Sequence, residues 1–301
     1  MTTPLKVIKS IAVTDATLTA TSVAESTYGA YSASTTYTLD DRVHLSHKVY
    51  QSLQSGNTGK DPLTETLWWV EVEATNRWKL FDLSSTTRTQ IDASDYYEIT
   101  PGQAINALAL VNISGILTIR IRLTDPTFGV VHDTGALDIM PAPSESSWYT
   151  WFFELRIEQT QIVFNDIPSY PSATLRIDFT SSGAAYIGAL VFGSQRTIGR
   201  GVNYGARLGI QDYSRKERND WGDTVLVQRA YSKTINIDTV IDNSELDNTY
   251  TLLADLRSTP CLWVATDIYG SLSVFGFYSN FEIIISYFSQ SDCSIELESL
   301  T

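Results

Sequence analysis

Residues 28–74 constrain the fold of this chain most, because this stretch is short, rich in aromatic rings and free of cysteine. Apolar and polar residues alternate over residues 42–45 and 48–53, and Ser46-His47 between them predicts the turn of a β-hairpin. A polar loop comes next and leads to the pair Trp68-Trp69. A module of under about 50 residues buries enough surface only with large side chains, disulfides, a metal or a host domain. We therefore expect about three short strands around a core of aromatic rings.

The aromatic residues of this module have two uses that the sequence leaves open. The rings can fill the core, which is the use we expect first, or they can stack on the apolar face of a sugar whose hydroxyl groups bind polar neighbours. The glycan-binding candidates are Tyr31, Tyr37, Tyr50, Trp68 and Trp69. Of these, Tyr50, Trp68 and Trp69 are the best candidates wherever they are exposed.

Several residues of the module occur in an order that resembles a known family. They are Tyr31, Tyr37, Asp40-Asp41-Arg42-Val43, Val49-Tyr50, Asn57-Thr58-Gly59, Pro62 and Trp68. Together they are similar to the small chitin-binding modules appended to bacterial chitinases. Two positions depart from the family's pattern, since Asp40 stands where the family usually has glycine and His47-Lys48 replaces its turn glycine. The resemblance covers about one sixth of the chain and implies a carbohydrate-binding module over residues 28–75.

Modules of this kind also occur inside tail proteins of bacteriophages, and residues 74–82 resemble the segment that comes directly after the module in those proteins. The resemblance implies a structural protein of a phage tail tip or baseplate, located in the virion tail after synthesis in the host cytoplasm. It also implies other tail proteins and copies of this chain as partners. Whether the module contacts a glycan on the host surface is left open.

Beyond the module, alternation of apolar and polar residues predicts longer strands. Leu117 to Leu123 alternate strictly, so one face of this strand lies in a core and the other in water. The predicted strands are residues 104–111, 116–123, 148–157, 161–164, 174–180 and 185–192. Strands at this spacing, with turn residues between them, predict a two-sheet, jelly-roll-like β-sandwich.

The last third of the chain predicts a second β domain with one helix. A glycine-rich linker or long loop is expected over residues 193–209, and Pro260 should stop the helix. Ser244 is expected to cap this helix, with Asp247 completing a capping box. The residues expected on one side of it are Leu246, Tyr250, Leu253, Ala254 and Arg257.

The chain as a whole is therefore predicted to be mainly β, in four parts. They are an N-terminal strand segment (1–27), the small three-stranded aromatic-core module (28–75), the jelly-roll-like sandwich (76–192) and the C-terminal β domain with one packed helix (193–301). Residues 1–27 favour one or two strands, which pair elsewhere in the protein or with a neighbour.

Charge and hydropathy narrow the partners. The 34 acidic and 21 basic residues give a net charge of −13, which argues against a nucleic-acid surface and against binding to an anionic membrane. No stretch is apolar and long enough for a signal peptide or a membrane span, so we expect neither export nor membrane insertion.

The residues needed for catalysis are sparse. His44, His47 and His132 are the only histidines, and no Gly-x-Ser-x-Gly elbow accompanies them, so no catalytic site is expected. His44 and His47 find no third ligand beyond the nearby Asp40-Asp41 pair, and we expect solvated turn histidines, no metal and no cofactor. Cys261 favours a buried thiol, and a disulfide between Cys261 and Cys293 is left open.

A basic cluster stands out in the acidic C-terminal domain. Arg215, Lys216 and Arg218 are expected in a loop of mixed charge, which either faces solvent or meets a partner. At a subunit interface these charges would set the register between copies. One helix covers only one face of a sheet, whereas residues 275–288 carry apolar rings on more than one face. Residues 193–301 are therefore expected to be the assembly platform of a ring or other closed oligomer.

Two functions are consistent with these patterns. The first is a structural part of a phage tail tip whose small module projects outward. The second is a non-catalytic glycan-binding adhesin, or an accessory module of a polysaccharide hydrolase, because the aromatic residues of the module suit sugar stacking.

Overall fold

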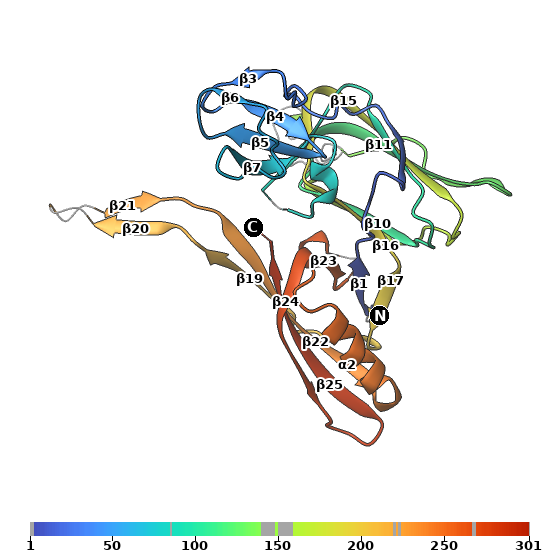
Figure 1. Ribbon diagram of the computed structural model, residues 1–301. Helices are drawn as coiled ribbons and strands as arrows, with labels where there is room; N and C mark the ends of the chain where they lie inside the picture. Colours follow the sequence, from blue (N-terminus) through green and yellow to red (C-terminus); the bar gives the residue numbers. More distant parts are fainter. Residues whose placement is uncertain are drawn as a thin grey trace.

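The computed structural model describes residues 3–84, 86–139, 148–149, 159–218, 221, 224–266 and 269–300. It confirms a mainly β protein with one packed α-helix. Figure 1 shows the small module beside a β-sandwich, and beneath them in this view a second large sheet from which a long arm projects.

The module contains two small sheets, and its hairpin lies where the sequence predicts it. β3 pairs with β6, and β5 lies between β4 and β7. The strands are β3 (Thr36–Tyr37), β4 (Arg42–Leu45), β5 (Lys48–Ser52), β6 (Asn57–Thr58) and β7 (Trp69–Ala74). Ser46 and His47 form the tight turn between β4 and β5 with φ angles of 49° and 65°. Two left-handed residues in succession match the twist of the flanking strands, which stabilises this short hairpin.

The β-sandwich combines a seven-stranded and a three-stranded sheet. The larger has the order β12-β11-β15-β9-β2, with β13 beside β11 and β8 beside β15; the smaller has the order β14-β10-β16. The first sheet contains β2 (Leu18–Thr21), β8 (Thr89–Ile91), β9 (Tyr96–Ile99), β11 (Ser114–Asp125), β12 (Gly129–Asp133), β13 (Leu137–Asp138) and β15 (Thr174–Ile187). The second contains β10 (Ala107–Val111), β14 (Gln161–Phe164) and β16 (Ala189–Gly193). Leu110, Ile121 and Phe179 belong to the core that joins the two layers.

One strand prediction for the sandwich needs correction, and a second falls almost entirely outside the described residues. The sequence predicts a break before residue 185, but β15 continues to Ile187 and the chain breaks at Gly188. A Cβ at Gly188 would lie only 2.7 Å from the Cβ of Asn112, so this crossing needs a glycine. The strand predicted at 148–157 lies outside the described residues, apart from Trp148 and Tyr149, which are helical.

The C-terminal domain is an eight-stranded sheet that includes the N-terminal strand. Its order is β17-β1-β23-β24-β25-β22-β18, with β19 also paired to β22. The strands are β1 (Leu5–Lys9), β17 (Gln195–Ile198), β18 (Gly201–Val202), β19 (Arg207–Asp212), β22 (Tyr231–Asp242), β23 (Cys261–Val264), β24 (Ser273–Ile284) and β25 (Gln290–Ser299). β1 lies between β17 and β23, and β2 joins the sandwich, so residues 1–27 do pair elsewhere in the protein.

The prediction of a linker or long loop at residues 193–209 is wrong, because β17, β18 and the start of β19 occupy most of this segment. Gly199, with φ of 70°, turns the chain between β17 and β18. Gly205, with φ of 112°, lies in the turn between β18 and β19, while Gly193, Gly201 and Gly209 lie within strands, so this run is not a linker.

The helix covers one face of the large sheet. A 3-10 turn, η2 (Asn243–Glu245), leads into α2 (Leu246–Asp255); the other 3-10 turns are η1 (Lys79–Phe81) and η3 (Gly270–Leu272). No side chain caps α2, so the predicted cap by Ser244 is wrong. Leu253 and Leu256 are buried against the sheet.

Of the residues expected on one side of the helix, Leu253 is buried, whereas Tyr250, Ala254 and Arg257 are exposed. The side that faces the sheet carries Thr249, Leu253 and Leu256. Asn243, the first residue of η2, is engaged with the loop before β25, and this contact fixes how the chain enters the helix.

The sandwich covers the other face of the same sheet at one end. Leu262, Val264 and Phe275 pack against Ala107 and Val191 of the smaller sandwich sheet. Phe275, one of the apolar rings for which the sequence predicts contact with another protein, is therefore buried within this chain. The tip of the β24–β25 hairpin lies beyond this contact (Figure 1) and stays exposed.

Candidate functional site

The core of the small module takes up most of its aromatic rings. Trp69 lies at the centre, with ring centroids 5.2 Å from Tyr37 and 6.0 Å from Tyr31, and its indole Nε1 donates to the Lys60 carbonyl at 2.8 Å. The exposed fractions of Tyr37, Tyr50 and Trp69 are 8%, 5% and 2%. These three candidates have no free ring face for a sugar. The reason is size, since a module this small needs its largest side chains inside.

Trp68 and Tyr31 are the candidates that keep part of their surface exposed. The ammonium of Lys60 lies 5.5 Å from the Trp68 ring centroid, and the exposed Leu67 comes just before it in the chain. Tyr31 stacks on Tyr37 at 6.0 Å, and burial followed by the charge of Asp61 raises the pKa of Tyr31. A partly exposed aromatic ring with a charged side chain close by, as at Trp68 with Lys60, suits a sugar ring and its hydroxyl groups.

A histidine attaches the module to the segment that precedes it. His47 Nδ1 lies 2.9 Å from Glu25 Oε1, and His47 Nε2 lies 2.9 Å from Asp15 Oδ1. Glu25 also pairs with Arg77 at 2.8 Å, and the His47 ring packs on Trp78 with centroids 4.3 Å apart. The expectation of a solvated turn histidine is therefore wrong for His47. Sequence patterns missed the site because Asp15 and Glu25 are far from His47 along the chain.

We call the contacts of His47 with Asp15 and Glu25 the tether. Burial and nearby charges shift the pKa values of His47 and Glu25 in opposite directions. Burial lowers the pKa of His47, but the hydrogen bonds and charges of Glu25 and Asp15 outweigh it, so the pKa lies above its ordinary value. Burial raises the pKa of Glu25, but His47, Thr75 and Arg77 outweigh it and lower this pKa. A charged histidine between two carboxylates is the favoured state at mildly acidic pH.

Metal and thiol chemistry find little support in the part of the chain that the structure describes. No group of three His, Cys, Asp or Glu residues there could hold a metal ion. Asp41 accepts hydrogen bonds from Thr38, and Asp40 accepts one from Gln51, so both carboxylates brace the hairpin. Cys261 and Cys293 are free thiols, and burial raises their pKa values to about 11 and about 12.

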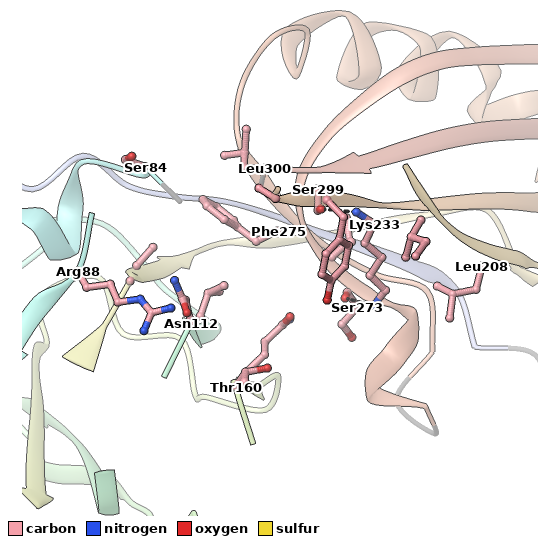
Figure 2. Close-up of a pocket in the computed structure, with 18 of the residues that line it drawn as sticks. Ser84, Arg88, Asn112, Thr160, Leu208, Lys233, Ser273, Phe275, Ser299 and Leu300 are labelled. Atoms are coloured by element: carbon pink, nitrogen blue, oxygen red, sulfur yellow. Dashed lines mark hydrogen bonds between the residues drawn. The ribbon is translucent and has the colours of Figure 1, made fainter. Parts of the chain in front are cut away.

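A concave site lies between the sandwich and the C-terminal sheet. Figure 2 shows Arg88, Asn112 and Thr160 on one side, and Lys233, Phe275 and Leu208 on the other. Its volume is about 900 Å³, and its apolar walls include Leu208, Ile210, Tyr231, Phe275, Val111 and Ala189. None of its lining residues is acidic. We call this site the groove.

Lys233 and Arg88 are the two cations that line the groove, and Lys233 is the half-buried one. Its ammonium donates to the Ser273 carbonyl at 3.1 Å, and burial lowers its pKa. Among the described residues no carboxylate pairs with it, although acidic residues outnumber basic ones in the chain. A half-buried cation without a counter-charge favours an acidic partner.

The predicted basic cluster lies on an extended arm. β20 (Arg215–Arg218) pairs with β21 (Thr224–Val227), and this ribbon continues the pairing of β19 with β22 away from the body of the protein (Figure 1). We call the described residues between 207 and 236 the arm. Arg215, Lys216 and Arg218 are therefore in a strand, and the expected loop is wrong at these positions; all three are exposed. Both faces of this ribbon are in contact with solvent, so its sequence lacks the alternation of apolar and polar residues by which a half-buried strand is predicted.

Comparison with known proteins adds no relative. No family model matches the sequence, and no curated protein or solved structure matches the chain. None of the described helices has the length and apolar character needed to cross a membrane.

Proposed function

We propose that this chain is a structural, non-catalytic component of a phage tail tip or baseplate that assembles with copies of itself and with other tail proteins around the tail axis. The observation that carries the proposal is the arm. Leu208, Ile210 and Leu226 are 50%, 67% and 74% exposed on a ribbon that is only two strands wide at β20 and β21. An isolated two-stranded ribbon is marginally stable in water, and exposed apolar patches mark interaction sites.

The resemblance of residues 28–82 to modules in phage tail proteins supports the same proposal. The exposed cations Arg215, Lys216 and Arg218 fit an acidic neighbour, and the net charge of −13 makes every other copy of this chain acidic. The location in the virion tail is part of this proposal.

Mass spectrometry of purified virions tests it most directly. We expect the chain at a copy number typical of a tail component, and a tail reconstruction should place residues 193–301 against a sister copy or another tail protein. A reconstruction in which residues 193–301 touch neither would refute the proposed assembly. Absence of the chain from purified virions would refute the proposed location.

A second function, glycan binding by the module as in an adhesin or an accessory module, has one specific observation in its favour. Trp68 keeps a partly exposed ring beside Lys60, with the exposed Leu67 next to it. Retention on insoluble chitin, followed by the same assay with Trp68→Ala, tests this function. Loss of retention with an unchanged melting temperature supports it, and Leu63→Ala, which changes an exposed apolar residue of the same module, is the matched control. If the wild type is not retained on any glycan tested, the module is a spacer or docking element.

A further inference from the structure

The tip of the β24–β25 hairpin displays an apolar cluster to solvent. Ile284, Ile285 and Tyr287 are 54%, 70% and 67% exposed, and Phe288 is fully exposed. We call residues 284–289 the knob. Monomeric soluble proteins rarely place this much apolar surface on one protruding loop, so the knob has the character of an interaction site.

The knob is held in one conformation by hydrogen bonds. The Asn243 side-chain amide donates to the carbonyls of Tyr287 and Phe288, both at 2.9 Å, and the Asn243 backbone donates to Ser289 at 3.1 Å. The Ser291 hydroxyl donates to Oδ1 of the same Asn243 side chain, and the Ser286 hydroxyl donates to the Asp292 carboxylate at 2.6 Å. A loop braced in this way loses little conformational entropy when it binds, which favours tight contact.

The knob and the groove have complementary chemistry. The knob is flanked by the carboxylates of Glu282 and Asp292, and residues 281–292 contain no lysine or arginine. The groove has apolar walls, the cations Arg88 and Lys233, and no acidic lining residue. An apolar, acid-flanked projection fits an apolar, basic recess.

One chain cannot make this contact with itself. Ser273, Val274 and Phe275 of β24 line the groove, while the last residue of the same strand, Ile284, begins the knob. At about 3.3 Å per residue the two ends of this strand lie roughly 36 Å apart. Figure 1 shows the tip of the β24–β25 hairpin directed away from the sandwich.

We infer that the knob of one copy inserts into the groove of the next copy, so that the chain associates head to tail through two different surfaces. The inference deepens the self-assembly in the proposed function and rests on it. A heterologous contact of this kind closes into a ring when its rotation divides a full turn, and otherwise extends as a filament. The charges of Lys233 and Arg88 orient the knob, and the apolar contact supplies most of the stability.

Cross-linking between two variants tests the contact directly. Ile285→Cys places a thiol on the knob and Leu208→Cys places one in the groove, and both positions are half or more exposed, so folding should persist. The native thiols are buried and do not compete. Under mild oxidation an equimolar mixture should give a covalent dimer containing one chain of each kind.

Tyr204→Cys is the matched control, because Tyr204 is almost fully exposed and lies outside both surfaces. Mixed with Leu208→Cys, it should give at least tenfold less dimer than Ile285→Cys gives. Equal yields from the two mixtures, or no dimer from the Ile285→Cys mixture at the highest soluble concentration, would overturn the inference.

A complementation experiment distinguishes two different surfaces from a self-paired one. Phe288→Ser damages only the knob and Lys233→Glu damages only the groove, so each variant alone should associate less than the wild type in sedimentation. The mixture should form dimers, because an intact knob then meets an intact groove. A mixture that associates no better than its components contradicts the head-to-tail contact.

Failure of this inference and failure of the proposed function give different results. A chain present in virion tails that shows no cross-link between the knob and the groove retains its proposed function and loses this contact. A chain that cross-links specifically but is absent from virions retains the contact and loses the proposed location.

Discussion

In the small module the central aromatic rings lie inside, whereas at the tip of the C-terminal hairpin the aromatic rings lie outside. Tyr50 and Trp69 are almost completely buried, and Tyr287 and Phe288 are largely or fully exposed. The buried core of this small module consists of Val43 and the rings of Tyr37, Tyr50 and Trp69, while Leu63 and Leu67 of the same module stay exposed. The C-terminal sheet already has a helix on one face and the sandwich on part of the other, so its remaining rings are available for contact with another molecule.

The largest effect should come from removing a module ring. Trp69→Ala should lower the stability of the module by about 3–5 kcal/mol, because it deletes the ring on which Tyr31 and Tyr37 pack. Phe288→Ala, at the exposed end of the comparison, should change stability by less than about 0.5 kcal/mol. Urea unfolding, with hydrogen exchange over residues 36–74, measures both. Equal costs for the two substitutions would remove the contrast between the regions.

The next effect concerns the arm. Arg215→Glu combined with Arg218→Glu should weaken assembly roughly tenfold, because it reverses two exposed charges at the proposed interface. The melting temperature of the isolated chain should change by less than about 2 °C, since surface substitutions of this kind alter stability little. Sedimentation and thermal unfolding of the same samples provide the measurements, with Arg196→Glu on the exposed edge strand β17 as the control. If the double substitution lowers the stability of the isolated chain more than it weakens assembly, these arginines stabilise the fold of the chain and not an interface.

A smaller effect is expected from pH, at the tether between the module and residues 15–25. The pKa of His47 lies above its ordinary value of 6.5. Protonated His47 therefore stabilises the tether fully below pH 6.5, and this contribution is lost as pH rises through the raised pKa. The pKa of Glu25 lies below its ordinary value of 4.5, so ionised Glu25 stabilises the tether fully above pH 4.5. This contribution is lost as pH falls through the lowered pKa. The tether should therefore be strongest between about pH 4.5 and 6.5.

The His47 side chain is partly exposed, so the whole contribution should stay under about 1 kcal/mol. Hydrogen exchange of residues 15–30, measured from pH 5 to pH 8, should report the loosening. His47→Gln should abolish the pH dependence, and His132→Gln on β12 should leave it unchanged. Identical profiles for the wild type and His47→Gln would show that the tether does not respond to protonation.

The smallest effect should come from reduction of the protein. Cys261 and Cys293 are free and buried in β23 and β25, so a reducing agent should leave the melting temperature unchanged. Thiol labelling should be slow in the native state, because burial keeps both pKa values high, and fast in urea. A drop in melting temperature on reduction would contradict the free thiols.

Local patterns predicted much of the architecture but less of the candidate sites. The β4–β5 hairpin and the long alternating β11 lie where neighbouring residues place them, since turn geometry and a two-residue period are properties of adjacent positions. The same patterns could not separate the buried ring of Tyr50 in β5 from the partly exposed ring of Trp68 just before β7, because both lie in short segments rich in aromatic residues. They also predicted a loop where β20 forms an exposed ribbon, because burial, which creates alternation, is absent there.

The sequence by itself determined that this chain is a mainly β protein with an aromatic-core module and one helix near its C-terminus, because these features depend on residues close together along the chain. Only the tertiary structure decided that β1 completes a sheet with β23, more than 250 residues later, that Asp15 and Glu25 meet His47, and that the groove and the knob lie at opposite ends of one hairpin. These arrangements depend on which surfaces pack together, and the free energy of that packing is shared among residues that no local pattern connects.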